Sequence, residues 1–382
     1  MTAHFAPEGH ALFTYCARSA LDLWFHAIAL PAGSEVLYSA LTIPHMPRIA
    51  EAHGLVPVPV DLEPETLLPD PKQVLAAAGP RSRVLVVAPL FGARPALDSL
   101  RTLARERNWL FVEDCAQAFD GKLTARSADL VLYSFGAIKT ATAAAGGVAV
   151  VRDAAVAARM GELQSTWPLQ TRRDQGKRLM RIGVLMLLGC PPIYGALDRL
   201  CRRLGRDRDG LVSGWARSFP GTDWLSRLRR QPSAALGALL LRRLRGDVAG
   251  HVAARAARGR ELLRRIGSHA LPGGALAVPG LAAGRGTHWV LPVGVDSPDE
   301  LVRALGQAGF DGSRRSSLEP VPVPRGHGAP EPRTARILLQ RMVFLPLDTP
   351  LPPRDWERLV DVLLEHARTH RTGPFAGAGR AV

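Results

Sequence analysis

Between residues 11 and 153, short apolar runs rich in β-branched residues alternate with segments of helical spacing, and this alternation is the strongest constraint on the fold. Strands that alternate with helices are typical of βαβ units, in which helices cover both faces of a mostly parallel sheet. We therefore predict an α/β domain over residues 1–168. The predicted strands lie at 35–38, 56–60, 84–88, 110–112, 130–133 and 147–151, and the predicted helices at 19–29, 43–53, 71–78 and 96–107.

The regular alternation ends near residue 169. Residues 169–225 form an insertion rich in Arg and apolar residues, and residues 226–266, rich in Ala, Leu and Arg, predict a helical connection. A smaller α+β domain is predicted over residues 267–382. Its predicted strands lie at 289–295 and 341–345, and its predicted helices at 299–308 and 354–366.

The composition excludes several classes of protein. A chain of 382 residues with 47% apolar residues can bury a sizeable core, whereas disordered chains combine low hydrophobicity with high charge. The four cysteines include no CxxC pair and the 11 histidines show no metal-ligand spacing, so we predict neither a disulfide framework nor a metal site. The first residues lack the basic and apolar regions of a secretory signal, which predicts a cytoplasmic protein.

The formal net charge of +15 is confined to one segment. Residues 171–265 hold 22 of the 49 Lys and Arg but only 7 of the 34 Asp and Glu, so this segment alone accounts for the net charge. Two interpretations follow: a surface for an anionic partner such as a membrane, or solvated helix faces on which Arg replaces Lys. Because no helix-turn-helix or aromatic-interleaved motif accompanies the charge, we do not expect nucleic-acid binding.

The insertion also carries an apolar stretch at residues 183–194, which the Pro191-Pro192 pair interrupts. About 20 unbroken apolar residues are needed to span a bilayer, so this stretch is not a transmembrane helix. Its Arg-rich flanks and nearby tryptophans suit a segment peripheral to the inner membrane face, with contact through residues 171–222. It also suits a helical hairpin packed on the body or on a second subunit. The tryptophans are Trp167, Trp215 and Trp224.

An acidic residue and a lysine follow two of the predicted strands. Asp114 ends the run that begins at Leu110, and Lys139 lies 25 residues later, after Ser134 and among small residues. Sheets of α/β domains place their ligand sites at the carboxyl ends of strands. A carboxylate and a lysine there are what pyridoxal phosphate needs, because the amine forms a Schiff base with the aldehyde and the acid pairs with the pyridinium nitrogen. Ser134 can donate to the phosphate.

These stretches resemble the DegT/StrS-type sugar aminotransferases, which are fold-type-I pyridoxal-phosphate enzymes. The family's E-D-x-A-Q strand end corresponds to residues 113–117, and its S-F-x-x-x-K-x-x-x-x-x-x-G-G motif to residues 134–147. Residues 31–36 are similar to its P-G-D-E-V turn, residues 58–61 to its P-V-x-D stretch, and residues 344–347 to its L-P-L strand. The resemblance implies a mostly parallel seven-stranded sheet between helices, followed by a smaller C-terminal α+β domain.

The resemblance also implies a role for the residues that match the motifs around the lysine. Lys139 would form the Schiff base with the cofactor and would later carry the proton between Cα and C4′. Asp114 would pair with the pyridinium nitrogen, and Gln117 would lie beside the O3′ of the ring.

The phosphate and the face of the ring involve residues of the first two helices. Ser134, together with Arg18 and Ser19 at the N-terminus of the first helix, would hold the phosphate, because helix N-termini bind anions through free N–H groups. The family often places an aromatic residue on the pyridine face, and His45 is the candidate for that position here.

Two motifs depart from the family pattern. The phosphate turn, usually Gly-Thr/Ser-Ala, has Ala-Arg-Ser-Ala at residues 17–20, so the Arg18 side chain faces either the phosphate or another partner. The N-Y-R-M motif, which brings an Asn to the active site of the partner subunit, has Arg-Leu-Arg-Arg at residues 227–230, and only Arg229 matches. The cross-subunit contact is therefore in question. The insertion, which lies near the substrate entrance in the family, indicates a substrate other than an ordinary nucleotide sugar.

From these motifs we predict a homodimeric aminotransferase of a biosynthetic pathway. It would take an amino group from an amino acid, Glu or Gln by resemblance, and pass it to a keto or aldehyde acceptor. That acceptor would be either a sugar or an amphiphilic or lipid-linked carbonyl compound. Family members that dehydrate sugars carry His in place of the lysine, so Lys139 argues against elimination. The alternative is a catalytically silent relative whose basic region binds a membrane or a partner protein.

Overall fold

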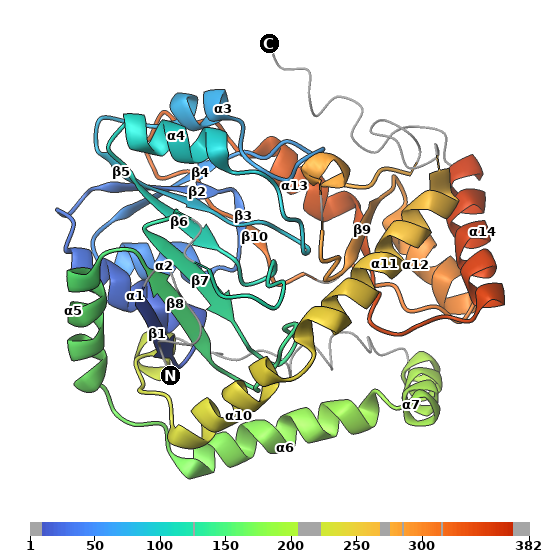
Figure 1. The fold of residues 1–382 in the computed structure, drawn as a ribbon. Helices are drawn as coiled ribbons and strands as arrows, with labels where there is room; N and C mark the ends of the chain where they lie inside the picture. The colour runs from blue at the N-terminus through green and yellow to red at the C-terminus, as the bar shows by residue number, and fades with distance from the viewer. Residues whose placement is uncertain are drawn as a thin grey trace.

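A seven-stranded sheet forms the centre of the large domain in the computed structural model, which describes residues 10–124, 127–204, 223–267, 276–284, 286–314 and 316–369. The strand order is β1-β8-β7-β6-β5-β2-β4 (Figure 1). Strand β8 runs antiparallel to both of its neighbours, and every other pairing is parallel, so the predicted sheet type is confirmed. The strands are β1 (His10–Thr14), β2 (Glu35–Ser39), β4 (Val56–Val60), β5 (Ser82–Val87), β6 (Leu110–Asp114), β7 (Leu130–Ser134) and β8 (Gly147–Val151).

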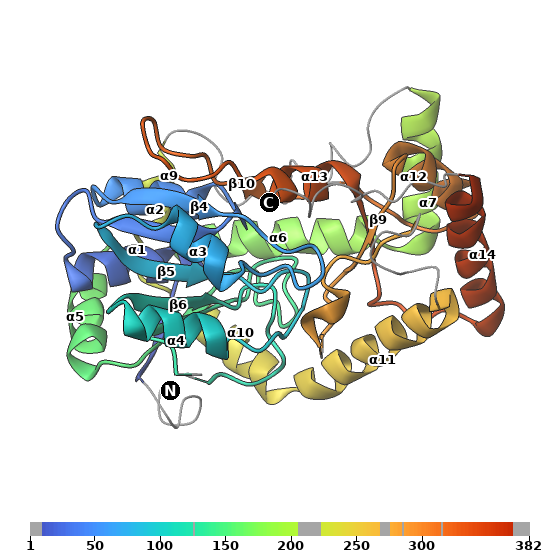
Figure 2. The same cartoon turned by 90° about the horizontal axis from the view of Figure 1, so that it is seen from above.

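Helices cover both faces of this sheet. Helices α1 and α5 pack against each other and against β8, whereas α3 and α4 pack together on the opposite side (Figures 1 and 2). Because helices lie on both faces, the strands are mostly apolar, and every residue of β2 and β8 is buried. The helices are α1 (Ala17–Ile28), α2 (His45–Ala52), α3 (Pro71–Ala77), α4 (Asp98–Glu106) and α5 (Ala154–Ser165).

Helix α1 contains a buried carboxylate that is tied to a distant part of the chain. Asp22 is 1% exposed and accepts two hydrogen bonds from Arg229, at 2.8 and 2.9 Å, and one from His53 at 2.9 Å. Burial alone would raise the pKa of Asp22, but the hydrogen bonds from His53 and Arg229 outweigh it and lower the pKa. Arg229, the single match to the N-Y-R-M motif, thus fastens the chain after the insertion to the central helix.

The insertion leaves and rejoins the body at one point. The Gln170 N–H donates to the Gln231 carbonyl, and the Gln231 N–H donates to the Pro168 carbonyl. Between them lie α6 (Arg172–Leu188), α7 (Pro191–Arg203) and the short α9 (Trp224–Leu228), while residues 205–222, including Trp215, lie outside the described ranges. The Pro pair that interrupts the apolar stretch begins α7, since proline is tolerated in the first turn of a helix.

Hydropathy along the described helices bears on the membrane question. No single helix in these ranges is long and apolar enough to cross a bilayer. Helix α6 and most of α7 meet that criterion only as a pair, and the two are bent by 75° at their junction.

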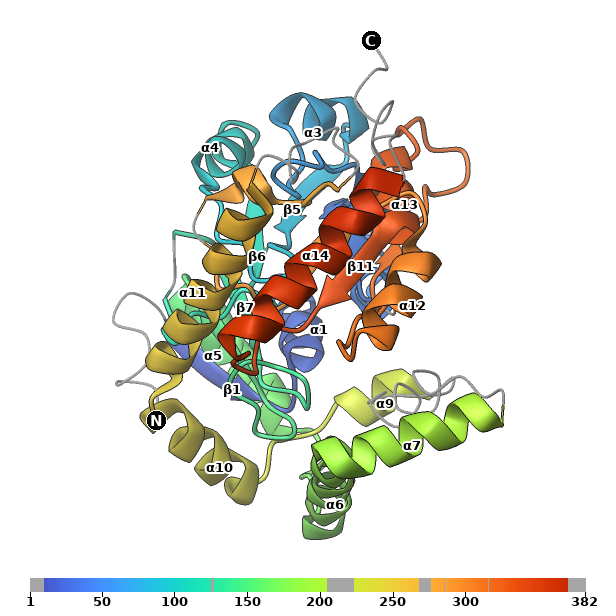
Figure 3. The ribbon, with the colours of Figure 1, turned by 90° about the vertical axis from the view of Figure 1, so that its right-hand side faces the viewer.

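The smaller unit at the C-terminus has its own apolar core. A two-stranded antiparallel sheet of β9 (Leu291–Gly294) and β11 (Met342–Leu345) packs with α12 (Pro298–Gln307) and α14 (Pro353–Thr369) (Figure 3). Helices α10 (Ala234–Arg245) and α11 (Val248–Ile266) lead into it, and α13 (Arg333–Arg341) precedes β11. A short bridge between β3 (Leu41–Thr42) and β10 (Glu319–Pro320) joins it to the large domain.

Candidate active site

Asp114 and Ser134 end two adjacent parallel strands, so they lie at the same edge of the sheet. Asp114 is 8% exposed, and its Oδ1 accepts a hydrogen bond of 3.0 Å from the Ala116 N–H. Burial raises the pKa of Asp114, while the Ala116 hydrogen bond and the charge of Lys139 oppose that rise. The carboxylate is therefore a buried acid that feels the positive charge of the predicted catalytic lysine.

Lys139 lies in the loop that follows β7 and is half-buried. Burial lowers the pKa of its amine to about 8; the charge of Asp114 opposes the shift and the charge of Arg18 adds to it. The neutral, nucleophilic form of the amine is thus far more abundant near neutral pH than it would be for a lysine with an ordinary pKa. The sequence contains only four lysines, the others being Lys72, Lys122 and Lys177.

The glycine pair of the lysine motif brings the N-terminus of α1 to this edge. Gly146 has a φ of +103° and donates its N–H to the Tyr15 carbonyl at 2.9 Å. A Cβ at Gly147 would overlap the main chain of Cys16 and Ala17, so only glycine permits this approach. Ser134 pairs with Gly147 in the sheet, so it lies beside the N-terminus of α1, where the first N–H groups have no acceptor within the helix, an arrangement suited to a phosphate.

Arg18 and His45 belong to the same cluster. Arg18 Nη1 lies 3.4 Å from His45 Nδ1, and its charge reaches Lys139. Burial, followed by the charges of Arg18 and Arg48, lowers the pKa of His45 to about 4, so its ring is neutral near pH 7. The ring of Trp224 meets that of His45 edge-on, with 5.1 Å between the centroids. A neutral ring at this place is compatible with stacking on a pyridine face, the role predicted for His45.

Two of the predicted residues have polar groups already in use. The Ser19 hydroxyl is fully buried and donates to the Leu228 carbonyl at 2.6 Å, so Ser19 can reach a phosphate only through its main-chain N–H. The Gln117 Oε1 accepts from the Phe91 N–H at 2.8 Å, which leaves the amide nitrogen of Gln117 for a ligand. For both residues the structure narrows the predicted role to one group.

Two residues that sequence reasoning missed cover the lysine from the C-terminal side. The ring centroid of Trp289 lies 4.6 Å from Lys139 Nζ, and the Trp289 Nε1–H donates to the Ile138 carbonyl at 3.0 Å. Arg255 is 4% exposed and donates from Nη2 to the Thr140 hydroxyl at 3.2 Å. The residues on both sides of Lys139 are therefore bound by side chains from the part of the chain that follows the insertion.

The signal for Arg255 was present in the sequence. The buried face of α11 carries Val252, Ala256, Gly259 and Leu262, and Arg255 falls in phase with them at helical spacing. A charged residue on an apolar helix face needs partners, which here are the Thr140 hydroxyl, the Thr287 carbonyl at 3.0 Å and the Asp348 carboxylate at 3.1 Å.

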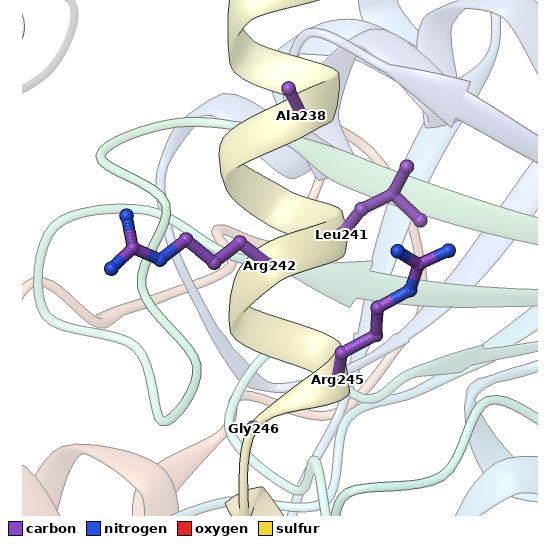
Figure 4. A pocket seen from close by; sticks show the side chains of 5 residues that line it. All are labelled: Ala238, Leu241, Arg242, Arg245 and Gly246. Atoms are coloured by element: carbon purple, nitrogen blue, oxygen red, sulfur yellow. The ribbon is translucent and has the colours of Figure 1, made fainter.

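A shallow hollow elsewhere does not include these groups. It is lined by Ala238, Leu241, Arg242, Arg245 and Gly246, all from α10 and its C-terminal end (Figure 4). Among the described residues, no group of three or more His, Cys, Asp and Glu side chains is placed to hold a metal ion.

Pyridoxal phosphate fits this donor set. The group needs an amine for its aldehyde, an acid for its ring nitrogen and an anion site for its phosphate. Lys139, the buried Asp114 and the start of α1 beside Ser134 offer these three at one sheet edge. Arg18 adds a positive charge at the side where the phosphate would lie, because it is the second residue of α1.

Comparisons with known proteins agree with this picture. Residues 2–184 match the model of the DegT/DnrJ/EryC1/StrS aminotransferase family. A curated relative, "L-glutamine:2-deoxy-scyllo-inosose aminotransferase" of Micromonospora echinospora, is 33% identical over 171 residues, which are 43% of this chain and 40% of that protein. The protein of the same name from Streptomyces kanamyceticus is 30% identical over 160 residues, which are 41% and 38% of the two chains.

Solved structures align along most of the chain. DesI, determined in the presence of its TDP-sugar product, is 26% identical with a TM-score of 0.65, and the alignment covers 96% of this chain and 83% of DesI. A DegT DnrJ EryC1 StrS aminotransferase from Brucella abortus, 17% identical with a TM-score of 0.69 and coverage of 94% and 87%, shows the shared fold. The match to the curated relatives, by contrast, spans about 40% of their length. These findings confirm the fold class and the resemblance, and pyridoxal phosphate, the predicted cofactor, is the cofactor of this family.

Proposed function

Because residues 2–184 match the model of the DegT/DnrJ/EryC1/StrS aminotransferase family, we propose that the chain belongs to this family and that the protein is a pyridoxal-phosphate-dependent aminotransferase. The observation that carries the proposal is the cluster at one sheet edge of Lys139, Asp114 and the N-terminus of α1. All of its members lie within the matched residues. Each has the chemistry that the reaction demands.

The positions of the site residues indicate a separate role for each. When bound, pyridoxal phosphate supplies an electron sink that stabilises negative charge at the α-carbon of the donor. Lys139 would hold the cofactor through Nζ and, once released, would move a proton with that same atom, which its lowered pKa favours. The Asp114 carboxylate would keep the ring nitrogen protonated. Ser134, Arg18 and the main-chain N–H of Ser19 would bind the phosphate.

The remaining site residues would orient the ring. His45, neutral near pH 7, would lie on the ring face, with Trp224 behind it at 5.1 Å between centroids. The amide nitrogen of Gln117 would donate toward the ring oxygen O3′. Trp289 and Arg255 would keep the lysine loop in place while Nζ moves.

The substrates are a finer part of the proposal. We infer an amino-acid donor, glutamine or glutamate, and a ketone acceptor of sugar-like or cyclitol type. The support is the names of the curated relatives, which include L-glutamine and an inosose, and the TDP-sugar product present with DesI. An amphiphilic or lipid-linked carbonyl compound is the variant of this acceptor that the basic insertion favours. A homodimer is proposed on the resemblance alone.

The test is covalent capture of the cofactor on a specific lysine. The purified protein is incubated with pyridoxal phosphate, reduced with borohydride, digested and analysed by mass spectrometry. We expect the added mass on the peptide that contains Lys139 and no added mass in Lys139→Ala. The matched control is Lys122→Ala, an exposed lysine after β6, which should label like the wild type.

Specific outcomes decide against the proposal. Label on Lys72, Lys122 or Lys177 in place of Lys139 would contradict the assignment of the lysine. No label on any lysine, at saturating pyridoxal phosphate, would favour the catalytically silent relative. A second sample, loaded with pyridoxal phosphate but not reduced, is given glutamine or glutamate separately, and loss of the visible absorbance of the bound cofactor identifies the donor.

A further inference from the structure

Helix α6 carries a stripe of apolar side chains on its outer surface. Of the eleven exposed large hydrophobic side chains among the described residues, eight lie between Leu169 and Leu204. Four of them are on α6, with exposed fractions from 45% for Leu179 to 69% for Met186; the other two are Met180 and Leu187. Leu179 and Met186 are seven residues apart, as are Met180 and Leu187, so each pair returns to nearly the same face of the helix.

A row of basic side chains borders this stripe. Arg173, Lys177 and Arg181 are exposed and four residues apart, which places them along one side of the helix. The only acidic residue of α6 is Asp174, in the first turn of the helix. Its Oδ2 accepts a hydrogen bond from the Thr171 hydroxyl and lies 3.5 Å from Arg230 Nη1. Because successive residues are about 100° apart around a helix, the Met180–Leu187 pair forms a second apolar line beside the Leu179–Met186 pair, and the basic row follows that second line. The outer surface of α6 is therefore apolar along two lines and positive beside one of them.

The opposite side of α6 is fastened to the body, so the stripe has a defined direction. Arg178 donates to the Tyr15 hydroxyl and stacks on the Tyr15 ring, and the buried Gln175 accepts from Gln170 at 2.6 Å. Helix α7 is tied to the small domain by the Tyr194 hydroxyl, which bonds Asp311 at 3.2 Å. Both helices lie at one edge of the molecule (Figures 1 and 3).

We propose that α6 lies flat on an anionic lipid surface, with Leu179, Met180, Met186 and Leu187 in the interface and the basic row against the headgroups. An amphipathic helix with apolar and basic sides binds such a surface through apolar burial and attraction to anionic lipid. This inference does not depend on the proposed aminotransferase activity.

The charge pattern selects lipid over a second copy of the chain. In a two-fold contact the same patch meets itself, so the basic rows of two copies would lie close together and repel each other. The sequence of α6 and α7 holds eight Lys and Arg against two Asp, which leaves no acidic face to match them. A surface that is both negative and receptive to apolar side chains satisfies the stripe and the row together.

The experiment is flotation of the full-length protein with vesicles. Vesicles of phosphatidylcholine alone are compared with vesicles that also contain phosphatidylglycerol, at low and high salt. We expect binding only to the anionic vesicles, with weaker binding at high salt. Lys177→Gln combined with Arg181→Gln should weaken it about thirty-fold, taking about 1 kcal/mol for each charge lost. Met180→Ser combined with Leu187→Ser should abolish binding at both salt concentrations.

Matched controls separate this surface from general charge and hydrophobicity. Arg159→Gln on α5 and Leu75→Ser on α3 remove an exposed arginine and an exposed leucine elsewhere, and both should bind like the wild type. Equal binding to both kinds of vesicle, no binding by the wild type, or no effect of the α6 variants would overturn the proposal. Loss of self-association in the Met180→Ser, Leu187→Ser protein without any vesicle binding would assign the stripe to a second copy. Because no cofactor is needed, these outcomes are independent of the lysine-labelling test.

Discussion

Lys139 lies between two walls that the chain builds in different ways. The first wall comprises Asp114, Ser134 and the N-terminus of α1, which main-chain pairing of adjacent strands brings together. The second wall comprises Trp289 and Arg255, whose side chains reach the lysine loop across 151 and 115 residues of sequence. Pairing of neighbouring strands is thus enough to bring the reactive groups together. The side chains that cover Lys139, by contrast, come from the part of the chain that follows the insertion.

This contrast predicts two kinds of effect. Groups of the first wall carry charge or face the cofactor, so their removal should change reactivity. Groups of the second wall bind the Ile138 carbonyl and the Thr140 hydroxyl. Their removal should therefore change the stability of the protein or the fraction of it that holds the cofactor. Variants that reverse this pattern would show that the two walls are not separate in function.

The largest effect is expected in the first wall, for Asp114→Asn. The amide keeps the shape but loses the charge that holds a proton on the ring nitrogen. We expect turnover to fall about a hundred- to a thousand-fold, the usual result of removing one preorganised electrostatic group. Covalent capture of pyridoxal phosphate on Lys139 should persist, as measured by borohydride reduction and mass spectrometry.

A matched control for that substitution is Asp98→Asn. Asp98 lies on α4 with an 81% exposed side chain, so its change should leave turnover unaltered. If Asp114→Asn retained wild-type turnover, the carboxylate would not be the partner of the ring nitrogen.

A stability effect of several kcal/mol is expected where the returning chain is fastened to α1. Arg229→Leu leaves the buried Asp22 carboxylate with His53 alone. Removing one partner of a buried pair costs about 3–5 kcal/mol, and we expect the lower end because Arg229 is 36% exposed. Urea unfolding measures the loss. Asp22→Leu combined with Arg229→Leu should recover much of it, because no charge is then left unpaired.

The pH dependence of that pair has a definite sign. Since the pKa of Asp22 is lowered in the folded protein, its contribution is present above the ordinary Asp pKa and is lost as pH falls below about 4. The Asp22→Leu, Arg229→Leu protein should therefore lose less stability than the wild type on acidification. Parallel acid-unfolding curves for the two proteins would contradict the assigned role of the pair.

Much of the large domain could be predicted because its strands are buried on both faces. The six predicted strands and four predicted helices of residues 11–153 are all present, with ends that differ by a few residues. Strand β1 was missed; it is an edge strand whose apolar residues, Ala11, Leu12 and Phe13, are only partly buried. Helix α13 was also missed. The predicted strand at 289–295 begins at Leu291, and Trp289, freed from the sheet, faces Lys139.

The candidate site also contains residues that the sequence indicates and residues that it does not. Asp114, Ser134 and Lys139 could be recognised because two short motifs on adjacent strands carry them. The partner of the Ser19 hydroxyl, the Leu228 carbonyl, lies 209 residues away, and no local pattern indicates it. Trp289 looked like part of an apolar run, and the phase of Arg255 with the apolar face of α11 indicates a buried charge but not which groups it binds. Long-range partners follow from topology, which local patterns do not contain.

A smaller effect should appear in the pH dependence of the lysine. Only the neutral amine attacks the aldehyde, so the rate of covalent capture should rise with pH and reach half its maximum near pH 8. Arg18→Gln should move that midpoint upward and Asp114→Asn downward, because their charges act on the amine in those directions. Capture rates measured by quenched reduction between pH 6 and about 10 give the midpoints.

The second wall provides the comparison for that titration. Trp289→Phe removes no charge and keeps a ring over Nζ, so its midpoint should equal that of the wild type. An equal shift in Trp289→Phe and Arg18→Gln would show that both walls set the reactivity of the lysine.

The smallest effect is that of Trp289→Phe on stability. The substitution removes the hydrogen bond from Nε1 to the Ile138 carbonyl but retains an aromatic face for the ammonium. One hydrogen bond is worth about 1 kcal/mol, so a small drop in thermal midpoint is expected. Trp289→Leu removes the ring as well and should in addition lower the yield of capture at Lys139. If Trp289→Phe and Trp289→Leu behave alike, the hydrogen bond alone holds the loop. If only Trp289→Leu loses capture, the ring positions the amine of Lys139, and the second wall takes part in the reaction as well as in the fold.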